Sequence, residues 1–494
     1  MIEDMDATGL AELVVNGEVS ATELLDDAIA RTEASAATLN AVPIRFDDAA
    51  RAQIEDAGGR PAGPFGGVPF LLKDLGQEFA GQPNTAGAAA HRDRRPAEHS
   101  AFTRRCLEAG LVIFGRTATP ELGLRAVTET KLWGASRNPW DAGRTPGGSS
   151  GGAAAAVAGG LVPMAGASDG GGSIRIPASF CGLFGLKPST GRISNGPGAG
   201  LNWEGASSQG VLTRSVRDTA RMLDVLCGPE PGDFYALGMP PRAYAAEPGI
   251  APGRLRIGFS TASPIGTAVD QACIDAVHQA ARLLEGLGHH VEEAVPELDG
   301  RAVAECYLKL YLGQVAAEVA ASGAPDSAFE PETAMLALLG RLFSSGDYVA
   351  AHLRWNGFAR ALGRFHQTHD FWMLPSVAAP PARIGELDTP KSQLRLLAAI
   401  RALRGGRLML KMGLLERMAQ ESLARTPFTQ ISNLTHTPSM SVPLHRAPAE
   451  PGGPELPVGV QFVGAHNSEG LMLRLAGQLE VAAPWPTRPG IGVT

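Results

Sequence analysis

The chain has 494 residues, which is enough for about three domains of roughly 150 residues or for one large domain with insertions. Its 43 basic and 50 acidic side chains give a formal charge of −7, which argues against a polyanion such as nucleic acid as a partner. Hydrophobic residues make up 44% and charged residues 19%, with 61 glycines and 37 prolines, so the composition excludes a disordered chain and indicates a turn-rich globular protein.

The sequence has no signal for a membrane or for export. No apolar stretch approaches the roughly 20 residues that span a bilayer, and residues 1–14 are acidic where a signal peptide is basic and then apolar. We therefore expect a cytoplasmic protein without a membrane partner. The 5 cysteines are widely spaced and form no Cys-x-x-Cys pair, so we expect neither a disulfide framework nor a structural zinc site.

The first half of the chain alternates between helical and strand patterns. Residues 1–60 have helical spacing, with a possible capping box in which Ser20 is followed by Glu23. Residues 41–46 form a short strand candidate. Up to about residue 230, apolar runs of strand length then alternate with helical patterns; the runs are 68–72, 111–114, 161–165 and 183–186. This alternation predicts an α/β fold with a buried, mixed sheet.

The second half continues the sheet and adds helices. Further strands are predicted at 255–259, 371–374 and 458–463, with a helix near 270–287. Between 300 and 425, long helical stretches such as 307–319 and 348–365 predict an inserted helical layer. Its aromatic residues either face a substrate or form the helix core; they are Tyr307, Tyr311, Phe343, Trp355 and Phe358. The predicted divisions are N-terminal helices at 1–60, a core at 61–230 and the helical insertion at 300–425.

Lys73 is the first candidate for a catalytic residue. It ends an apolar strand pattern and is one of only 6 lysines, against 37 arginines. A snorkelling lysine, or one paired with Asp74, would explain the position structurally. A buried lysine is also a source of a neutral amine base, because desolvation lowers its pKa, and arginine cannot serve in this way.

Residues 147–152, Gly-Gly-Ser-Ser-Gly-Gly, form the second candidate. A flexible linker is disfavoured because a helix of small residues and then a strand follow at once. Glycines on both sides of Ser149 and Ser150 permit unusual backbone conformations. The run also matches Gly-x-Ser-x-Gly, the nucleophile elbow of α/β-hydrolases, which is a competing interpretation. It is not a phosphate-binding P-loop, since no Gly-Lys-Ser/Thr ends it.

A third motif, residues 168–177, places three glycines directly before Ser173. Such a run either forms a tight turn or frees several backbone N–H groups to converge on one point, as in an oxyanion hole. The 11 histidines are scattered and lack the pattern of a catalytic base. Two glycine-flanked serines and one apolar lysine therefore suggest a Ser-Ser-Lys relay, in which an amine replaces imidazole.

These motifs together resemble the amidase signature family. The resemblance rests on Lys73, on residues 147–152, on Gly-Gly-Ser173-Ile-Arg-Ile-Pro 24 positions after Ser149, and on the run from Phe180 to Arg192. It covers nearly the whole chain and is poorest at 300–425. It implies one large domain over residues 1–494, with a central mixed sheet flanked by helices. Residues 133–140 and the overall length are similar to hydrolases of cyclic nylon oligomers and to bacterial aryl acylamidases.

The resemblance also implies residue roles. Ser173 would be the nucleophile, and Ser149, which follows a cis peptide bond in the family, would bridge it to Lys73. The oxyanion hole would consist of the backbone N–H groups of Gly170, Gly171, Gly172 and Ser173, and the supporting residues would be Ser150, Asp169 and Arg175. No metal or cofactor is required, and the protein would be a monomer or a homodimer.

Two segments depart from the family pattern. The chain has Ala-Ser168-Asp169 where the family often has Gly-Thr-Asp, a change that preserves hydrogen bonding. It has Asn433-Leu-Thr-His436-Thr-Pro-Ser439 where Asn-x-x-Gly-x-Pro-Ala is usual. We expect this histidine to change the shape of the pocket without changing the chemistry.

We therefore expect hydrolysis of the C–N acyl bond of a small-molecule amide through an acyl-enzyme. The amide would be linear, cyclic, an anilide or a carbamate (urethane). One alternative is the amidase-like subunit of a tRNA-dependent amidotransferase, which requires a partner subunit. The other is an esterase with a Ser149 elbow and a histidine base.

Overall fold

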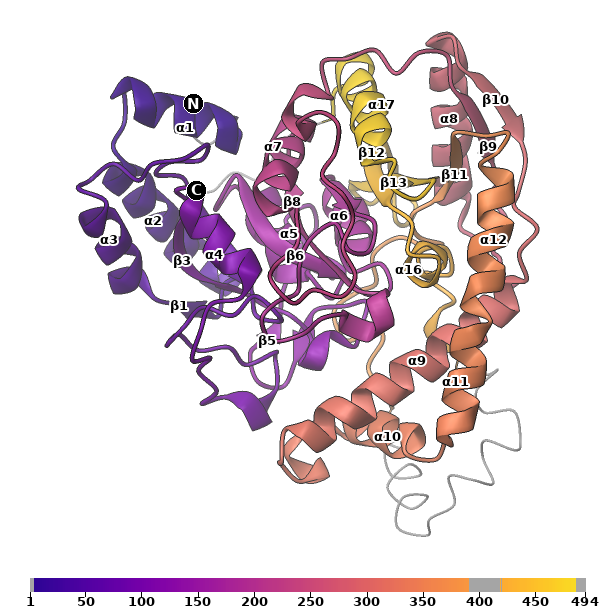
Figure 1. The fold of residues 1–494 in the computed structure, drawn as a ribbon, viewed down its shortest axis with the longest axis horizontal. Helices are drawn as coiled ribbons and strands as arrows, with labels where there is room; N and C mark the ends of the chain where they lie inside the picture. The colour runs from indigo at the N-terminus through magenta and orange to yellow at the C-terminus, as the bar shows by residue number, and fades with distance from the viewer. Residues whose placement is uncertain (1–3, 391–417, 419, 486–494) are drawn as a thin grey trace.

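A mixed β-sheet forms the centre of the computed structural model, which describes residues 4–390, 418 and 420–485 (Figure 1). In this part of the chain the sheet has eleven strands in the order β1-β3-β2-β6-β8-β7-β12-β13-β11-β9-β10. The strands are β1 (Ile44–Arg45), β2 (Pro69–Lys73), β3 (Val112–Thr117), β6 (Met164–Asp169), β7 (Phe184–Lys187), β8 (Ser208–Thr213), β9 (Arg256–Phe259), β10 (His290–Glu293), β11 (Phe371–Pro375), β12 (Ser439–Pro448) and β13 (Glu455–Gly464). A separate small sheet pairs β4 (Glu129–Thr130) with β5 (Gly134–Ala135).

The pairing confirms the predicted mixed sheet. Strand β2 is parallel to both β3 and β6, and β9 is parallel to β10 and β11. Strands β8, β7, β12 and β13 continue the sheet in antiparallel fashion. The predicted strand at 41–46 contracts to two residues, because only Ile44 and Arg45 pair with β3.

Side chains alternate between the two faces of the sheet, as the period-two geometry of a strand requires. In β2, Phe70 and Leu72 belong to one hydrophobic cluster and Leu71 to another. The helices complete the α/β domain on both faces; they are α1 (Ala7–Asn16), α2 (Ala21–Leu39), α3 (Asp47–Asp56), α4 (Ala101–Glu108), α5 (Gly151–Ala158), α6 (Arg175–Cys181), α7 (Val216–Leu226), α8 (Gln271–Gly286), α16 (Gln430–Leu434) and α17 (Glu469–Ala482). Helices α2 and α5 contribute to the Leu71 cluster, and α7 and α17 to the Phe70 cluster.

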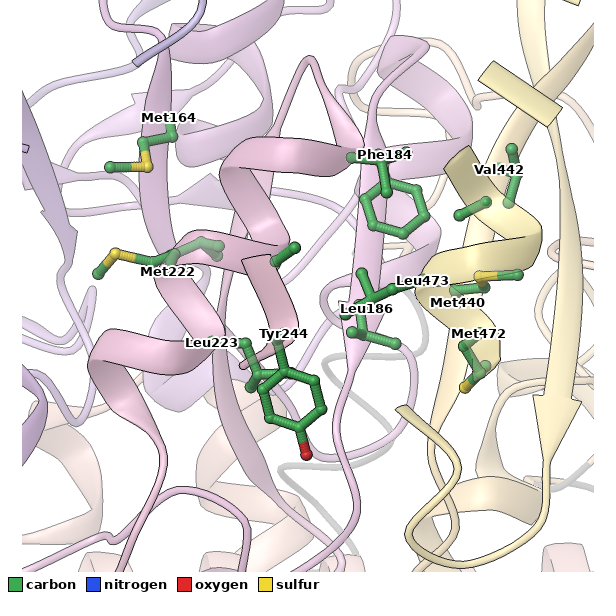
Figure 2. Close-up of a cluster of buried hydrophobic side chains, with 14 of the residues drawn as sticks. Met164, Phe184, Leu186, Met222, Leu223, Tyr244, Met440, Val442, Met472 and Leu473 are labelled. Atoms are coloured by element: carbon green, nitrogen blue, oxygen red, sulfur yellow. The ribbon is translucent and has the colours of Figure 1, made fainter. Parts of the chain in front are cut away.

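Figure 2 shows how the C-terminal strands join this core. Phe184 and Leu186 of β7 lie between Met222 of α7 on one side and Met440 of β12 on the other, with Met472 of α17 nearby. All five side chains are at most 3% exposed. This packing holds β12 and the residues before it against the same sheet that carries β2 and β6.

The predicted capping box at the start of α2 is confirmed. The Ser20 hydroxyl oxygen accepts a hydrogen bond from the N–H of Glu23 at 3.1 Å, and the Glu23 carboxylate accepts one from the N–H of Ser20 at 2.8 Å. This reciprocal pair satisfies two N–H groups that the first turn of a helix leaves free. The helix therefore begins where the local sequence predicts.

The predicted helical layer consists of α9 (Gly300–Ala321), α10 (Pro331–Gly340), α11 (Ser345–Leu353) and α12 (Trp355–Phe365), on the opposite side of the molecule from α1–α3 (Figure 1). The prediction of one helical stretch at 348–365 is wrong, because Arg354 ends α11 and begins α12. Residues 391–417 and 419 of the predicted insertion lie outside the described residues. Within the described part of the chain, no helix has the length and apolar character to cross a membrane.

Candidate active site

Lys73 is the last residue of β2, and its side chain is completely buried. Its Nζ lies 2.8 Å from Ser149 Oγ and 3.0 Å from Ser168 Oγ, so it contacts both glycine-rich segments. The neighbouring Asp74 is not its partner. Its carboxylate instead accepts hydrogen bonds from the N–H groups of Thr85, at 2.7 Å, and Gly87, at 3.3 Å. The interpretation of Lys73 as half of an ion pair with Asp74 is therefore wrong.

The environment of Lys73 favours the neutral amine. Burial lowers the pKa of Lys73 to about 7, with the negative charge of Asp169 opposing the shift. Desolvation disfavours the charged form of a lysine, and the attraction of Asp169 recovers only part of that loss. A substantial share of the Lys73 side chains is therefore uncharged near neutral pH and can accept a proton.

The turn that carries Ser149 is closely packed. Its peptide bond with Gly148 is cis. A Cβ added at Gly148 would lie 2.5 Å from the carbonyl oxygen of Arg125, so the approach of these two backbones requires glycine there. Ser150 connects the same turn to β6, because its hydroxyl lies 3.3 Å from the carbonyl oxygen of Ser168.

The loop with the three glycines runs from the end of β6 to the start of α6, and Asp169 organises it from inside. The Asp169 carboxylate accepts hydrogen bonds from the N–H of Gly172 at 2.7 Å and the N–H of Ile174 at 3.2 Å. Gly172 has φ +124°, a conformation that a residue with a side chain rarely adopts. Of the four N–H groups predicted for an oxyanion hole, that of Gly172 thus already has a partner in the loop.

Arg175 joins this loop to the C-terminal part of the chain. Its fully buried guanidinium donates to Asp169 Oδ1 at 2.8 Å and also to four groups from later segments: the carbonyl of Thr429, Ser432 Oγ, Gln461 Oε1 and Asn433 Oδ1, all at 2.7–2.8 Å. The positive charge of Arg175 holds the pKa of Asp169 well below its usual range despite the burial of that carboxyl. Both supporting residues are therefore charged, and they lock the loop in place.

Ser149 and Ser173 meet at one cavity of about 1230 Å³, which Gly170 and Gly171 also line. Ser149 is 2% exposed, whereas Ser173 is partly exposed toward the cavity. The structure thus brings together the three predicted catalytic side chains: Lys73 contacts Ser149, and Ser149 shares the cavity with Ser173. Among the described residues, no group of three His, Cys, Asp or Glu side chains is placed to hold a metal ion.

The aromatic residues of the helical layer divide between the cavity and the core. Tyr307 and Tyr311 line the cavity. Phe343, Trp355 and Phe358 do not; they pack in hydrophobic clusters, so the idea that they face a substrate is wrong. Four of the five lie on helices, and Phe343 lies in the connection between α10 and α11. The rotation of each helix decides which of its faces meets the cavity.

His436 does not line the cavity either. Its ring lies 5.9 Å from that of Trp355 and 6.4 Å from that of Tyr235, measured between centroids. Its φ of +60° is in the left-handed region, which explains why a glycine fits this position in the family pattern. The expectation that His436 reshapes the pocket is therefore wrong.

Three residues at the site could not be predicted from the sequence. Trp203 and Glu318 line the cavity, and Thr429 donates a hydrogen bond from Oγ1 to the carbonyl of Gly171 at 2.6 Å. None of them belongs to a motif, and each reaches the site from a different segment. Asn433, which donates a hydrogen bond to Asp169 Oδ1 at 3.0 Å, begins a segment that departs from the family pattern, so the sequence offered no signal for this contact either.

Comparison with known proteins gives a consistent result. A family model described as Amidase matches residues 23–473. The 6-aminohexanoate-cyclic-dimer hydrolase of Pseudomonas sp. (strain NK87) is 38% identical over 498 residues, covering 98% of this chain and 96% of that protein. The structure of 6-aminohexanoate cyclic dimer hydrolase complexed with substrate superposes with a TM-score of 0.89 at 35% identity, covering 99% of both chains. That of a bacterial aryl acylamidase superposes with a TM-score of 0.82 at 26% identity, covering 97% of this chain and 96% of that one. The chain belongs to the amidase signature family and is an amidase that acts on carbon–nitrogen bonds.

Proposed function

We propose that this amidase hydrolyses small-molecule amides through a relay of Ser173, Ser149 and Lys73. The observation that carries the proposal is the contact of a fully buried lysine amine with Ser149 beside the cavity that Ser173 lines. A neutral Lys73 accepts the proton of Ser149, Ser149 accepts that of Ser173, and Ser173 Oγ forms a bond to the amide carbonyl carbon. An amine of lowered pKa suits this task, because a base works best when its pKa lies near the operating pH.

The remaining steps use the same groups in reverse. The C–N bond breaks as the leaving nitrogen takes the proton back through Ser149, which leaves an ester on Ser173. Water then attacks this ester, with Lys73 again receiving a proton through Ser149, and the acid departs as Ser173 regains its hydrogen. Because the N–H of Gly172 donates to Asp169, the N–H groups left for the carbonyl oxygen are those of Gly170, Gly171 and Ser173.

The substrate class is proposed from the cavity and the relatives together. A volume of about 1230 Å³ exceeds the roughly 300–1,000 Å³ typical of small-molecule pockets, so the cavity accommodates an extended or cyclic amide. The 38% identity with a 6-aminohexanoate-cyclic-dimer hydrolase favours aliphatic cyclic and linear amides as substrates. The likeness to an aryl acylamidase supports anilides as the next class, and carbamates complete the series to be tested.

The competing esterase mechanism requires a histidine base, so a histidine at the cavity is the residue to test. Of the 11 histidines, all of which the structure describes, His91 lines the cavity; its ring packs against Phe329 at 5.9 Å between centroids. A serine–histidine mechanism would have to use it. We expect His91→Ala to hydrolyse amides at close to the wild-type rate, whereas Lys73→Ala does not.

The decisive experiment is to trap the acyl-enzyme. The protein is mixed with a p-nitrophenyl ester at low pH, digested and analysed by mass spectrometry, and the released products are measured for a panel of cyclic amides, linear amides, anilides and carbamates. We expect the added acyl mass on the peptide that contains Ser173, and its absence in Ser173→Ala. Acylation of Ser149 instead would overturn the relay and support the elbow mechanism.

A further inference from the structure

Several carboxylates line the cavity, and the proposed mechanism uses none of them. Glu318, on α9, lines the cavity and is partly buried. Its contact in the wall is with the indole N–H of Trp203, which donates to Oε1 at 3.4 Å. Within the described part of the chain, no lysine, arginine or histidine forms an ion pair with it. A carboxylate in such a wall is costly unless some other group compensates its charge.

The other charges of the cavity do not provide that compensation. Three of its four arginines are engaged elsewhere: Arg94 pairs with Glu78, Arg125 with Asp388 and Arg425 with Glu386. The fourth, Arg92, is exposed. A second acid, Glu332, also lines the cavity, and its Oε2 is buried without a hydrogen-bond partner in the described residues. Among the described residues, neither Glu318 nor Glu332 therefore has an ion-pair partner in the cavity.

Aromatic rings connect Glu318 to the catalytic loop. The indole Nε1–H of Trp203 donates a hydrogen bond to Glu318. The other edge of the ring, at Cε3, lies 3.5 Å from the position that a Cβ on Gly170 would occupy. The Tyr311 ring stands across it at 5.8 Å between centroids and 70° between planes, and Tyr307 stacks on Tyr311 at 6.1 Å. Glu318 is therefore separated from the oxyanion loop by one indole ring.

A carboxylate in a partly buried wall without an ion-pair partner is a site for an alkylammonium group. The carboxylate neutralises the cation and accepts its hydrogen bonds. Burial raises the pKa of Glu318 to about 7, and an adjacent ammonium would favour the ionised carboxylate. A neutral donor would leave the cost of the buried charge uncompensated.

We propose that Glu318 is a specificity-determining residue that receives a protonated amino group of the substrate, so that amides bearing an alkylammonium group are preferred over neutral amides of equal size. The inference rests on the proposed function, since it places the cleaved bond at Ser173. The ammonium would lie beyond the indole of Trp203, joined to the reacting carbonyl or to the leaving nitrogen by several methylene groups.

The test compares matched substrates in matched variants. One pair is the p-nitroanilides of hexanoic acid and 6-aminohexanoic acid; the other is the N-hexyl and N-(6-aminohexyl) amides of acetic acid. Glu318→Gln keeps the acceptor for Trp203 but removes the charge. Glu305→Gln is the control, because Glu305 is on the same helix and pairs with Lys309 outside the cavity. Glu332→Gln tests the other acid.

We expect wild type and Glu305→Gln to prefer the cationic member of at least one pair in kcat/KM by roughly ten- to a hundredfold, the value of one hydrogen bond to a charged group. In Glu318→Gln the preference should disappear while turnover of the neutral member persists. A purely structural role for Glu318 would lower both members equally. An unchanged preference in Glu318→Gln, or its loss in Glu332→Gln instead, would overturn the proposal.

A binding measurement tests this inference independently of the proposed reaction. Calorimetric titration with hexylammonium chloride and with 1-hexanol requires no turnover. Wild type should bind the amine more tightly than the alcohol, and Glu318→Gln should bind the two alike. Amine binding without hydrolysis of any amide would contradict the proposed function and leave the inference intact. Equal binding of amine and alcohol by wild type would overturn the inference alone.

Discussion

The loops around Lys73 and the helical wall formed by α9 and α10 meet at the same cavity but differ in how firmly their side chains are held. Lys73, Asp169 and Arg175 are completely buried, and hydrogen bonds from several segments determine their positions. On the wall, Tyr311 and Glu318 are only partly buried, and among the described residues each side chain forms a single hydrogen bond. From this difference we expect a change in the loops to alter the reaction itself and a change in the wall to alter which substrate is accepted.

The largest effect should come from Ser173→Ala. Loss of the nucleophile should lower kcat by at least about a hundredfold for every substrate, with little change in stability, because only one partly exposed hydroxyl is removed. Ser207→Ala, at another serine that lines the cavity, is the control and should retain activity. Steady-state rates and thermal unfolding of both variants provide the measurement. A Ser173→Ala enzyme with more than about a hundredth of the wild-type rate would contradict the nucleophile assignment.

Lys73 should set the pH dependence. The base must be neutral, and burial lowers its pKa to about 7, so kcat/KM should rise as the pH passes through about 7 and then level off. Lys73→Ala should lose about 10²–10⁴-fold in rate and no longer show this rise. Initial rates from pH 5 to 10 measure both effects. A maximum of kcat/KM below pH 6 would make a lysine base untenable.

Arg175→Met should be the most destabilising of these changes. It leaves the Asp169 carboxylate buried without its cation and removes hydrogen bonds to four groups in two later segments, so the free energy of unfolding should fall by about 3–5 kcal/mol. Arg341→Met breaks an exposed pair with Asp326 and should cost less than about 1 kcal/mol. Denaturant unfolding compares them. Equal costs would show that the loop does not depend on Arg175.

Tyr311→Leu should change selectivity. Because Tyr311 lines the cavity, its loss should shift the ranking among amide, anilide and carbamate substrates by about 1–3 kcal/mol, while hydrolysis of a small activated ester changes far less. Phe358→Leu, in the same helical layer but packed in its core, should lower stability and leave the ranking unchanged. Steady-state kcat/KM values test both variants. Proportional loss on esters and amides in Tyr311→Leu would mean that the wall is only scaffold.

The smallest effect should come from His436→Gly. The ring is outside the cavity, so substrate ranking should not change. Glycine relieves the left-handed backbone, a gain of roughly 1–2 kcal/mol, but removes the packing against Trp355 and Tyr235, so the net change in stability should be small. His436→Asn, which tolerates this conformation, is the comparison. A change in ranking would place His436 at the substrate after all.

The elements that could be predicted from the sequence are those with strong local patterns. The apolar run at 68–72 became β2, and Ser20 and Glu23 formed their capping box. Strands β8 and β12 were not predicted. The first reads Ser-Gln-Gly-Val-Leu-Thr with only two apolar residues in its six, and the second contains two prolines, so neither shows an alternating pattern. Their partners in the sheet, not their own sequences, make them strands.

The sequence alone was enough to propose Lys73, Ser149 and Ser173 as the catalytic residues, because they lie in short motifs whose neighbours shape the local backbone. It also determined that Asp169 and Arg175 accompany them. Only the tertiary structure decided that Arg175 binds segments more than 250 residues away and that Tyr311 faces the cavity while Phe358 faces the core. It also decided that the indole of Trp203 lies between Glu318 and Gly170. The reason is physical: a motif is specified by adjacent residues, but the face that a helix presents is set by its packing against elements far away in the chain.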